Sequence, residues 1–371
     1  MKIGIDARMI RVTGIGRYIE QLTVALVEVG QDVTPILQPR DVAWWQENHP
    51  GIEHLSAPEP IYSWREQLSF PARLRAERFD VVHFGNFNVP FTWSRPAVVT
   101  LHDLTPLAFA GERRRGFTVR RAYRAVLANA LGKNKHVIVP SQSVAGTIKR
   151  DYQPASLNVI PHALSQVFFS DPTSTVVRAE FCRKHDISKP YVLYVGNMRQ
   201  HKNVETLIKA FAEFSKGVSA QLVLAGPVES SHTAQLQMLV GKLEIQQAVR
   251  WTDALSVEEL LAAYDGARLL VHPSRAEGFG FTPLEAAARR VPTIVSSAVP
   301  TRALLGRGVV SFDPANTEEL SSLISIVWAD PHMRAQLVTR ARSIAAVRTW
   351  KDVAQETVEV YKTFKTHSVK S

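Results

Sequence analysis

The stretch VHPSRAEGFGFTPLE (residues 271–285) decides both the fold and the site that the sequence predicts. An apolar run that ends at Val271 reads as the end of a buried strand. TPLE (282–285) reads as a helix start, with threonine as the N-cap, proline at the first helical position and glutamate at the third. Glu277 and Glu285 therefore flank a strand-to-helix turn, and in a parallel sheet such turns lie where ligands bind.

On spacing alone, these two carboxylates have either a structural role or a role in ligand binding. In the structural explanation, Glu285 belongs to a capping box and Glu277 is a solvated loop residue. The neighbours favour a ligand site, because Gly278 and Gly280 on either side of Phe279 let the backbone approach a ligand closely. The free amides of a helix N-terminus also attract an anion.

This segment resembles the signature of retaining glycosyltransferases of the GT-B fold, specifically the large family 4. Members carry two glutamates with GFG or GFP between them, and here Glu277, Gly278-Phe279-Gly280, Pro283 and Glu285 complete the pattern. The resemblance implies an α/β protein with two Rossmann-like parallel-sheet domains facing across a cleft, and a C-terminal helix that crosses back to the first. It also implies that Glu285 holds the donor ribose, that Glu277 orients the donor sugar, and that the glycine-flanked segment binds the donor.

Length and periodicity agree with two domains. A chain of 371 residues exceeds the usual size of one core, and strand–turn–helix units repeat along it. Prolines, charge and broken periodicity place the boundary near 165–190. We expect an N-terminal domain over residues 1–170 on the acceptor side, a donor domain over 171–348, and a terminal helix over 349–371.

Other helix signals are local. Ser256 and Asn316 each precede a glutamate three residues on, which predicts capped helices. In the terminal segment Trp350, Val353 and Tyr361, with Val358, have the apolar spacing of a helix that packs on a core. Residues 40–75 look less regular, with several tryptophans and prolines.

Composition excludes several classes. The single cysteine, Cys182, rules out an internal disulfide and a cysteine-based zinc site, which suits a reducing cytoplasm. The sequence shows no apolar leader region and no run of about 18 apolar residues, so we expect neither secretion nor membrane spanning. The net charge of +10 attracts polyanions, anionic lipids or phosphorylated substrates. No basic-aromatic module, zinc finger or helix-turn-helix supports nucleic-acid binding.

Basic residues are dense over 113–124, at Arg113, Arg114, Arg115, Arg120, Arg121 and Arg124. An apolar helical pattern follows them. The segment either lies on an anionic membrane surface or forms a solvated helix face whose other side packs in the core.

The first strand, predicted over 2–8, leads to Gly14-Ile15-Gly16 and a helix from about Tyr18. A dinucleotide fingerprint is poorly supported, because its sixth position is Ile19 rather than glycine. The glycine turn at a helix N-terminus suits a phosphate. The resemblance assigns Gly14 and Gly16 to the donor diphosphate, and a plain tight turn is the alternative.

His102 follows a predicted strand in PAVVTLHDLTPL (96–107). A lone histidine in such a place is more often structural than catalytic. Family 4 enzymes often show VTxHDL here, however, and the resemblance places His102 near the donor sugar.

The second domain opens with a strand to Val195, a turn at Gly196-Asn197, and a cationic loop holding Arg199 and Lys202 before a helix near Asn203. Such a loop is a natural receptor for a diphosphate. The resemblance implies that an arginine and a lysine stabilise the departing nucleotide. Lys202 matches the family lysine. Many members have the arginine where this chain has Asn197, so Arg199 is the candidate replacement.

The resemblance therefore implies transfer of a sugar from a nucleotide-diphosphate donor to a hydroxyl, with retention at the anomeric carbon. His102, Arg199, Lys202 and Glu277 are the predicted catalytic residues, and Asn197 is counted with the donor-binding residues. No Asp-x-Asp motif is present, so we expect no metal and no cofactor. The motifs look most like bacterial mannosyltransferases that use GDP-mannose, acting at the inner face of the membrane on a lipid-linked or polysaccharide acceptor. A UDP-sugar donor and a nucleotide-sugar epimerase of the same fold are the alternatives.

Overall fold

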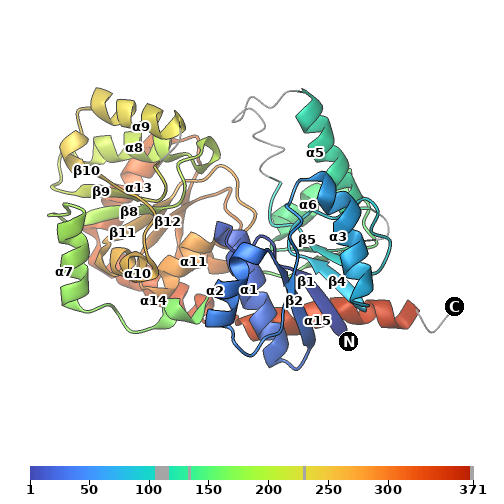
Figure 1. The fold of residues 1–371 in the computed structure, drawn as a ribbon. Helices are drawn as coiled ribbons and strands as arrows, with labels where there is room; N and C mark the ends of the chain where they lie inside the picture. Colours follow the sequence, from blue (N-terminus) through green and yellow to red (C-terminus); the bar gives the residue numbers. More distant parts are fainter. Residues whose placement is uncertain (105–116, 133–134, 229–230, 368–371) are drawn as a thin grey trace. The chain divides into compact units, whose positions relative to one another are not determined.

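The computed structural model describes residues 1–104, 117–132, 135–228 and 231–367 (Figure 1). The chain forms two compact units: the first joins Met1–Ala163 to Thr349–Ser371, and the second is Leu164–Arg348. Both units are built from a parallel sheet with helices on its two faces, which confirms the predicted fold class.

Within the described residues, the first unit holds a seven-stranded sheet in the order β3-β2-β1-β4-β5-β6-β7. All of its recorded strand pairs are parallel. The strands are β1 (Lys2–Asp6), β2 (Asp32–Leu37), β3 (Leu55–Ser56), β4 (Val81–Phe84), β5 (Ala97–Thr100), β6 (His136–Val139) and β7 (Ser156–Val159). The helices are α1 (Thr13–Glu28), α2 (Pro39–Asn48), α3 (Trp64–Ala76), α5 (Phe117–Ala130), α6 (Gln142–Asp151) and α15 (Trp350–His367).

Strand residues of the first unit alternate between two apolar clusters, as the pleat requires. Ile3 and Ile5 pack with side chains of α1, α2 and α15 on one face of the sheet. Val82 and Phe84 pack with side chains of α3, α5 and α6 on the other. The sheet is therefore covered on both faces.

In its described part, the second unit has a six-stranded parallel sheet in the order β10-β9-β8-β11-β12-β13. The strands are β8 (Tyr191–Val195), β9 (Gln221–Ala225), β10 (Val249–Thr252), β11 (Leu269–His272), β12 (Thr293–Ser296) and β13 (Val310–Phe312). The α-helices are α7 (Thr175–Lys184), α8 (Val204–Phe214), α9 (Ser231–Lys242), α10 (Val257–Gly266), α11 (Phe281–Ala288), α12 (Thr301–Leu305), α13 (Thr317–Ala329) and α14 (Pro331–Ala345). Short 3₁₀ turns are η1 (Gln166–Phe169), η2 (Gln200–Lys202), η3 (Gln246–Ala248) and η4 (Gly306–Gly308).

The same alternation organises the second unit. Val192 and Tyr194 of β8 join a cluster with α8, α9 and α13. Tyr191 and Leu193 join a cluster with α7, α10, α11 and α14. Every second residue of this strand thus faces the same group of helices. The helices that cover the sheet are seen in Figure 1.

Each sheet reverses its strand order at one internal point. In the first unit the chain lays β2 and β3 on one side of β1 and then places β4 on the other. In the second unit β8 and β11 are the corresponding neighbours. At such a point the flanking connections diverge, and the carboxyl ends of the two strands leave room for a ligand. The loops after β1, β4, β8 and β11 are therefore the positions to search for function.

The terminal helix α15 belongs to the core of the first unit, as predicted. Trp350, Val353 and Tyr361 are buried in the same cluster as β1 and α1, and Val358 packs against it. The helix is thus an integral layer of the sheet's cover rather than an appendage.

A buried polar chain fixes α15 to the sheet. The hydroxyl of Tyr361 lies 2.6 Å from Nδ1 of His83, and Nε2 of His83 lies 2.7 Å from Oγ1 of Thr100. Thr100 Oγ1 is in turn 2.8 Å from the hydroxyl of Tyr18. Each buried polar group therefore has a partner, which removes most of the cost of its desolvation.

Two expectations need correction, and a third is confirmed. Helix α1 begins at Thr13 rather than near Tyr18, so the glycines lie in its first turn. The region 40–75 is more regular than expected, because it contains α2 and α3 with Trp45 and Phe70 as buried anchors. Its prolines hid the helical period, since Pro39 occupies the first turn of α2, where proline is tolerated. The capped helices predicted at Ser256 and Asn316 are confirmed.

The basic segment 113–124 falls only partly within the structure, because residues 113–116 and the side chains of 117–120 lie outside the described part. In α5, Arg121 and Arg124 are exposed, whereas Leu127 is buried and Tyr123 packs against the core. The described part thus has one solvated face and one core face. Its contact with a membrane stays a prediction.

The buried His83 predicts a pH-dependent stability of the first unit. Burial, with a smaller contribution from His102, lowers the pKa of His83 to about 3. The unfolded chain takes up a proton near pH 6.5, so stability is complete above that pH and is lost as the pH falls toward 3. Between pH 6.5 and 5, the loss is about 2 kcal/mol for this one group. Urea unfolding at a series of pH values measures it, and His83→Gln should flatten the dependence by about that amount. The partly exposed His232→Gln serves as the control, and equal slopes for wild type and His83→Gln would contradict the prediction.

Candidate active site

Two loops of the second unit are joined at the carboxyl ends of β8 and β11. The amide of Arg275 donates to the carbonyl of His201 at 2.8 Å. Asn203, which adopts a left-handed conformation (φ 58°) before α8, donates from Nδ2 to the carbonyl of Pro273 at 3.1 Å. These bonds hold the cationic loop against the segment that carries Glu277.

The side chains of Lys202 and Glu277 form an ion pair between these loops. Lys202 Nζ donates to Glu277 Oε1 at 2.6 Å, and the two side chains are only 16% and 13% exposed. Ser274 Oγ donates to the same oxygen at 2.7 Å, and His272 Nε2 lies 3.0 Å from it. Oε1 of Glu277 is therefore in contact with a lysine, a histidine and a serine side chain.

His272 and Ser274 were not among the predicted site residues. They are two residues apart at the end of an extended strand, so they project to the same side. A carboxylate oxygen can only accept, so Nε2 of His272 carries a proton and donates it to Glu277. Their positions shortly before Glu277, at the end of a strand, were the sequence signal that could have indicated them as its partners.

The charge state of Glu277 follows from these contacts. Burial by itself would raise the pKa of this carboxyl group, but the charge of Lys202 and the hydrogen bonds from His272 and Lys202 outweigh it. The pKa therefore lies well below its usual range. Glu277 remains a carboxylate throughout the neutral range and acts as a hydrogen-bond acceptor.

Arg199 and Asn197 lie on the same β8–α8 connection. The side chain of Arg199 is exposed, and its guanidinium has no recorded partner among the described residues. The carbonyl of Asn197 accepts from Tyr194 Oη at 2.7 Å, and Asn197 Oδ1 accepts from the amide of Arg199 at 3.3 Å. Asn197 thus shapes the turn, while Arg199 is available to an anion.

The predicted helix start with Thr282 as N-cap is wrong, and so is the capping box that was one of the two explanations of Glu285. Helix α11 begins at Phe281, and its N-cap is Gly280 with φ +90°, a conformation that glycine adopts readily. Glu285 is buried and accepts a hydrogen bond from the hydroxyl of Tyr264 at 2.7 Å. The carboxylate therefore needs another explanation than helix capping.

Phe279 points into the protein rather than away from it. Its side chain is 5% exposed and belongs to the core cluster of the second unit, with its ring 5.3 Å from that of Phe281. Gly278 and Gly280 are buried beside it. Any donor contact of this segment would thus come from the main chain.

In the first unit, the two predicted donor glycines have different surroundings. A Cβ on Gly16 would overlap the carbonyl oxygen of Ile10, so the fold itself requires glycine there. A Cβ on Gly14 would meet no described atom within 4 Å beyond its neighbours and its own helix. Packing explains Gly16 but leaves Gly14 unexplained.

His102 makes contacts within the first unit. Its Nε2 lies 2.9 Å from the carbonyl oxygen of Gly85, and its Nδ1 lies 3.4 Å from Nε2 of His162. Burial lowers the pKa of His102 to about 4, so the ring is neutral at pH 7. It packs edge-on against Tyr18, with 4.8 Å between the ring centres. The histidine is therefore held in place by its neighbours, and its predicted contact with the donor sugar is not tested by them.

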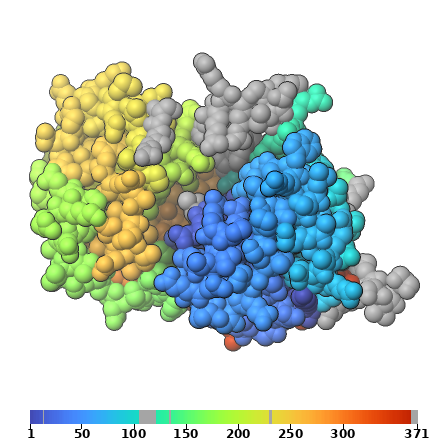
Figure 2. Space-filling view, in the orientation of Figure 1, coloured from blue at the N-terminus to red at the C-terminus, as the bar shows by residue number. Residues whose placement is uncertain are grey.

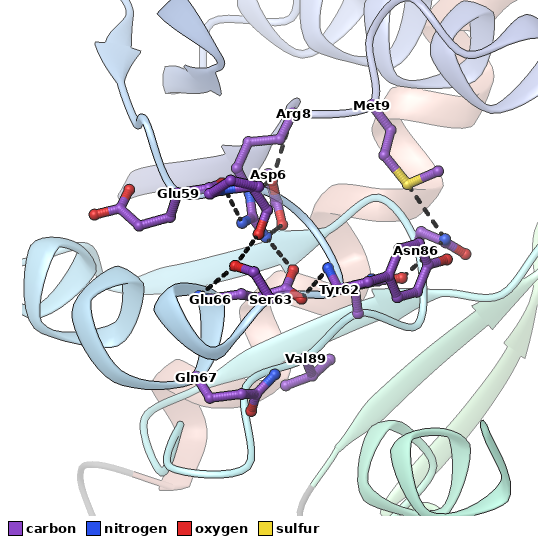
Figure 3. Close-up of polar contacts among 12 residues, drawn as sticks. Asp6, Arg8, Met9, Glu59, Tyr62, Ser63, Glu66, Gln67, Asn86 and Val89 are labelled. Atoms are coloured by element: carbon purple, nitrogen blue, oxygen red, sulfur yellow. Dashed lines mark hydrogen bonds and ion pairs between the residues drawn. The ribbon is translucent and has the colours of Figure 1, made fainter. Parts of the chain in front are cut away.

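The loop after β1 holds a buried ion cluster that sequence reasoning missed (Figure 3). Arg8 is almost fully buried and bonds both oxygens of Asp6, at 2.8 and 2.7 Å. Its Nη2 also donates to Glu66 Oε1 at 2.8 Å, and its guanidinium stacks over Phe70 at 3.7 Å. An aspartate at a strand end followed two residues later by an arginine was the only signal, and it was read simply as part of the strand.

No group of at least three histidine, cysteine, aspartate or glutamate side chains among the described residues is arranged to hold a metal ion. No helix in the described part of the chain has the length and apolar character needed to cross a bilayer.

Comparison with known proteins bears on both units. The family described as "Glycosyl transferases group 1" matches residues 178–344, and "Glycosyltransferase Family 4" matches residues 12–165. The chain belongs to the family 4 glycosyltransferases. This glycosyltransferase is 28% identical over 250 residues to the O-antigen chain mannosyltransferase RfbU of Salmonella typhimurium, an alignment that covers 66% of each chain, just under two thirds of that relative. It is 24% identical to the O-antigen chain mannosyltransferase B of Escherichia coli, over 85% of this chain and 84% of the other.

Solved structures show the same fold for this glycosyltransferase. The sucrose-phosphate synthase of Thermosynechococcus elongatus superimposes with a TM-score of 0.79 at 20% identity, covering 99% of this chain and 100% of the other. HepE of Anabaena, in complex with UDP and glucose, gives 0.80 at 18% identity, covering 98% and 100%. Both are similar in fold over essentially the whole length.

The burial of the Lys202–Glu277 pair in this glycosyltransferase predicts an unusual sensitivity to truncation. Lys202→Ala leaves a largely desolvated carboxylate without its cation and should cost about 2–3 kcal/mol of unfolding free energy. Lys209 pairs with Glu205 at the same 2.6 Å, but those side chains are 45% and 49% exposed. Lys209→Ala should therefore cost about 0.5 kcal/mol or less. Urea unfolding of the two variants measures the difference, and similar losses for both would show that burial does not set the strength of the pair.

Proposed function

We propose that this enzyme transfers mannose from GDP-mannose to a hydroxyl group of a lipid-linked or polysaccharide acceptor, with retention at the anomeric carbon. Glycosyl transfer itself follows from the family. The choice of mannose is supported by the two O-antigen mannosyltransferases among its relatives. The observation that carries the site is the Lys202–Glu277 pair, which lies where the strand order of the second sheet reverses.

The proposed role of Lys202 is to stabilise the departing diphosphate. Cleavage of the bond to the sugar builds negative charge on the leaving oxygen, and fixed positive groups are the largest usual source of stabilisation. An ammonium group has three N–H donors, so Lys202 can keep its bond to Glu277 while it contacts a phosphate oxygen. The exposed guanidinium of Arg199, on the same loop, adds a second cation.

Glu277 is proposed to orient the donor sugar rather than to attack it. Its contacts among the residues that the structure describes all fall on Oε1, so Oε2 is the oxygen proposed to accept sugar hydroxyls. Its low pKa keeps it unprotonated, which suits an acceptor and excludes a role as general acid. Glu285, held by Tyr264, is proposed to bind the ribose hydroxyls.

The acceptor is assigned to the first unit. There the side-chain amide of Asn88, which follows β4, is buried and has no partner for its Nδ2 among the described residues. A buried donor of this kind is costly unless a ligand satisfies it. An acceptor hydroxyl at the carboxyl end of β4 would do so.

A UDP-sugar is the second candidate donor. The Anabaena structure with UDP and glucose bound shares the fold of this chain over 98% of its length. Family 4 members that differ in donor also share most of the motif residues, so the fold gives no preference for the base.

Nucleotide-induced thermal stabilisation tests the donor. GDP should raise the melting temperature more than UDP or ADP, because a ligand stabilises the state that binds it. Lys202→Ala should remove most of this rise, whereas Lys209→Ala should leave it unchanged. If UDP alone protects the enzyme, the mannose assignment is wrong. NMR of the transferred sugar then reports the anomeric configuration, and inversion would contradict the proposed stereochemistry.

The two glycines offer a paired test of the donor assignment in the first unit. Gly14→Ala meets no steric obstacle and should leave the melting temperature unchanged or slightly higher. If the amide of Gly14 contacts the diphosphate, the same change weakens GDP-mannose binding about tenfold, measured by calorimetry. Gly16→Ala should lower the melting temperature instead, because its Cβ meets the carbonyl of Ile10. Unchanged donor affinity in Gly14→Ala would remove Gly14 from the donor site.

A further inference from the structure

Large apolar side chains are exposed together at the start of α3. Tyr62 is 63% exposed, Trp64 84%, Leu68 70% and Phe91 52%. Tryptophan side chains are on average largely buried, so an exposure of 84% is uncommon. We refer to these residues, Tyr62, Trp64, Leu68 and Phe91, as the α3 patch.

The four side chains belong to one surface. Trp64 and Leu68 are one helical turn apart and therefore lie on the same side of α3. Gln67 connects the helix to the loop of Phe91, because its side-chain oxygen accepts from the amide of Phe91 at 2.9 Å. Its carbonyl accepts from Thr92 Oγ1 at 3.1 Å. The α3 patch thus spans the first turns of the helix and the loop after β4.

The backbone beneath the α3 patch is fixed by the buried ion cluster (Figure 3). Oε2 of Glu66 accepts from the amide of Tyr62 at 2.7 Å, while Oε1 of the same carboxylate is held by Arg8. Ser63 caps the helix by accepting from the amide of Glu66. The apolar side chains are therefore presented by a rigid element rather than by a loose loop, which lowers the entropic cost of binding.

Arginines lie beside the α3 patch, and the partly exposed Glu77 follows the far end of α3. Arg65, Arg75 and Arg95 lie within or beside it, and Arg95 Nη1 donates to the carbonyl of Arg75 at 3.3 Å. In the described segments 62–76 and 91–96 the only acidic side chain is Glu66, which is 2% exposed and neutralised by Arg8. An apolar centre thus stands among arginines, with no exposed carboxylate in either segment. Figure 2 shows part of this light-blue region of the chain on the visible face.

We propose that the α3 patch docks the protein on an anionic lipid bilayer. Tryptophan, tyrosine and phenylalanine favour the boundary between headgroups and acyl chains, and leucine adds apolar area there. Arg65 and Arg95 meet lipid phosphates, and each such contact strengthens binding about fivefold on an anionic surface. A rim of arginines without an exposed acidic residue in these segments is complementary to anionic lipid. A zwitterionic surface lacks the net negative charge that these arginines would attract. The contact is independent of the basic segment 113–124.

Co-sedimentation of the full chain with vesicles tests the docking, without donor or acceptor. Wild type should bind vesicles of phosphatidylcholine with one quarter phosphatidylglycerol, and bind pure phosphatidylcholine at least tenfold more weakly. Trp64→Ser with Leu68→Ser should lower binding to the anionic vesicles at least tenfold. Arg65→Gln with Arg95→Gln should lower it about 25-fold, two contacts at about fivefold each. The matched control is Val176→Ser with Val347→Ser, which removes side chains that are 72% and 78% exposed in the second unit, and it should bind as wild type does.

Depth measurements separate the α3 patch from other lipid contacts. Brominated lipids quench tryptophans that enter the bilayer, so wild type should lose fluorescence on such vesicles, and Trp64→Phe should lose far less while it still binds. Unchanged melting temperatures show that the variants are folded. Equal binding of wild type and Trp64→Ser/Leu68→Ser, or equal quenching of wild type and Trp64→Phe, would overturn the proposal. So would a loss of self-association in the serine variant with vesicle binding intact, which would make the patch an interface between two copies. Because no nucleotide is present, any of these results leaves the proposed transfer reaction standing.

Discussion

One carboxylate, that of Glu277, governs the geometry of the second unit's site. Removed from most of the solvent, it stays ionised because Lys202, His272 and Ser274 converge on a single oxygen. An unpaired charge at such a position would be strongly unfavourable. The two loops that carry the pair are also joined by main-chain contacts, so neither can move without straining the other. This constraint exists only because β8 and β11, far apart in the chain, are neighbours in the sheet.

The first unit also buries polar groups at its strand ends, but it pairs them in another way. Arg8 and His83 are satisfied inside the fold, by carboxylates and by hydroxyls respectively. Their role is to fix connections: one cluster sets the start of α3, and the other attaches α15 to the sheet. Polar networks that are fully satisfied in this way specify a unique arrangement, whereas a partly satisfied one destabilises it.

The sequence was sufficient for the features that rest on short-range patterns. Alternating and helical periods predicted the parallel sheets and the terminal helix, and the spacing of Glu277, the glycines and Glu285 indicated the family. What it could not supply depends on three-dimensional neighbours. Glu285 looked like a capping residue, because the left-handed turn at Gly280 that starts the helix earlier is invisible in the pattern. Gly14 and Gly16 looked alike, and only the position of the Ile10 carbonyl separates them. The partners of Glu277 are present in the sequence, but their contacts with one and the same oxygen arise only in the folded sheet.

The layer contributed by α15 also has a consequence for how the protein is made. Trp350, Val353 and Tyr361 complete the core that surrounds β1 and α1, yet they are synthesised after the entire second unit. On the ribosome, the apolar side of α1 and the imidazole of His83 lack these partners until the second unit and α15 have been synthesised. The core of the first unit is therefore incomplete until α15 has been synthesised, so this unit cannot finish folding before the second one has been made.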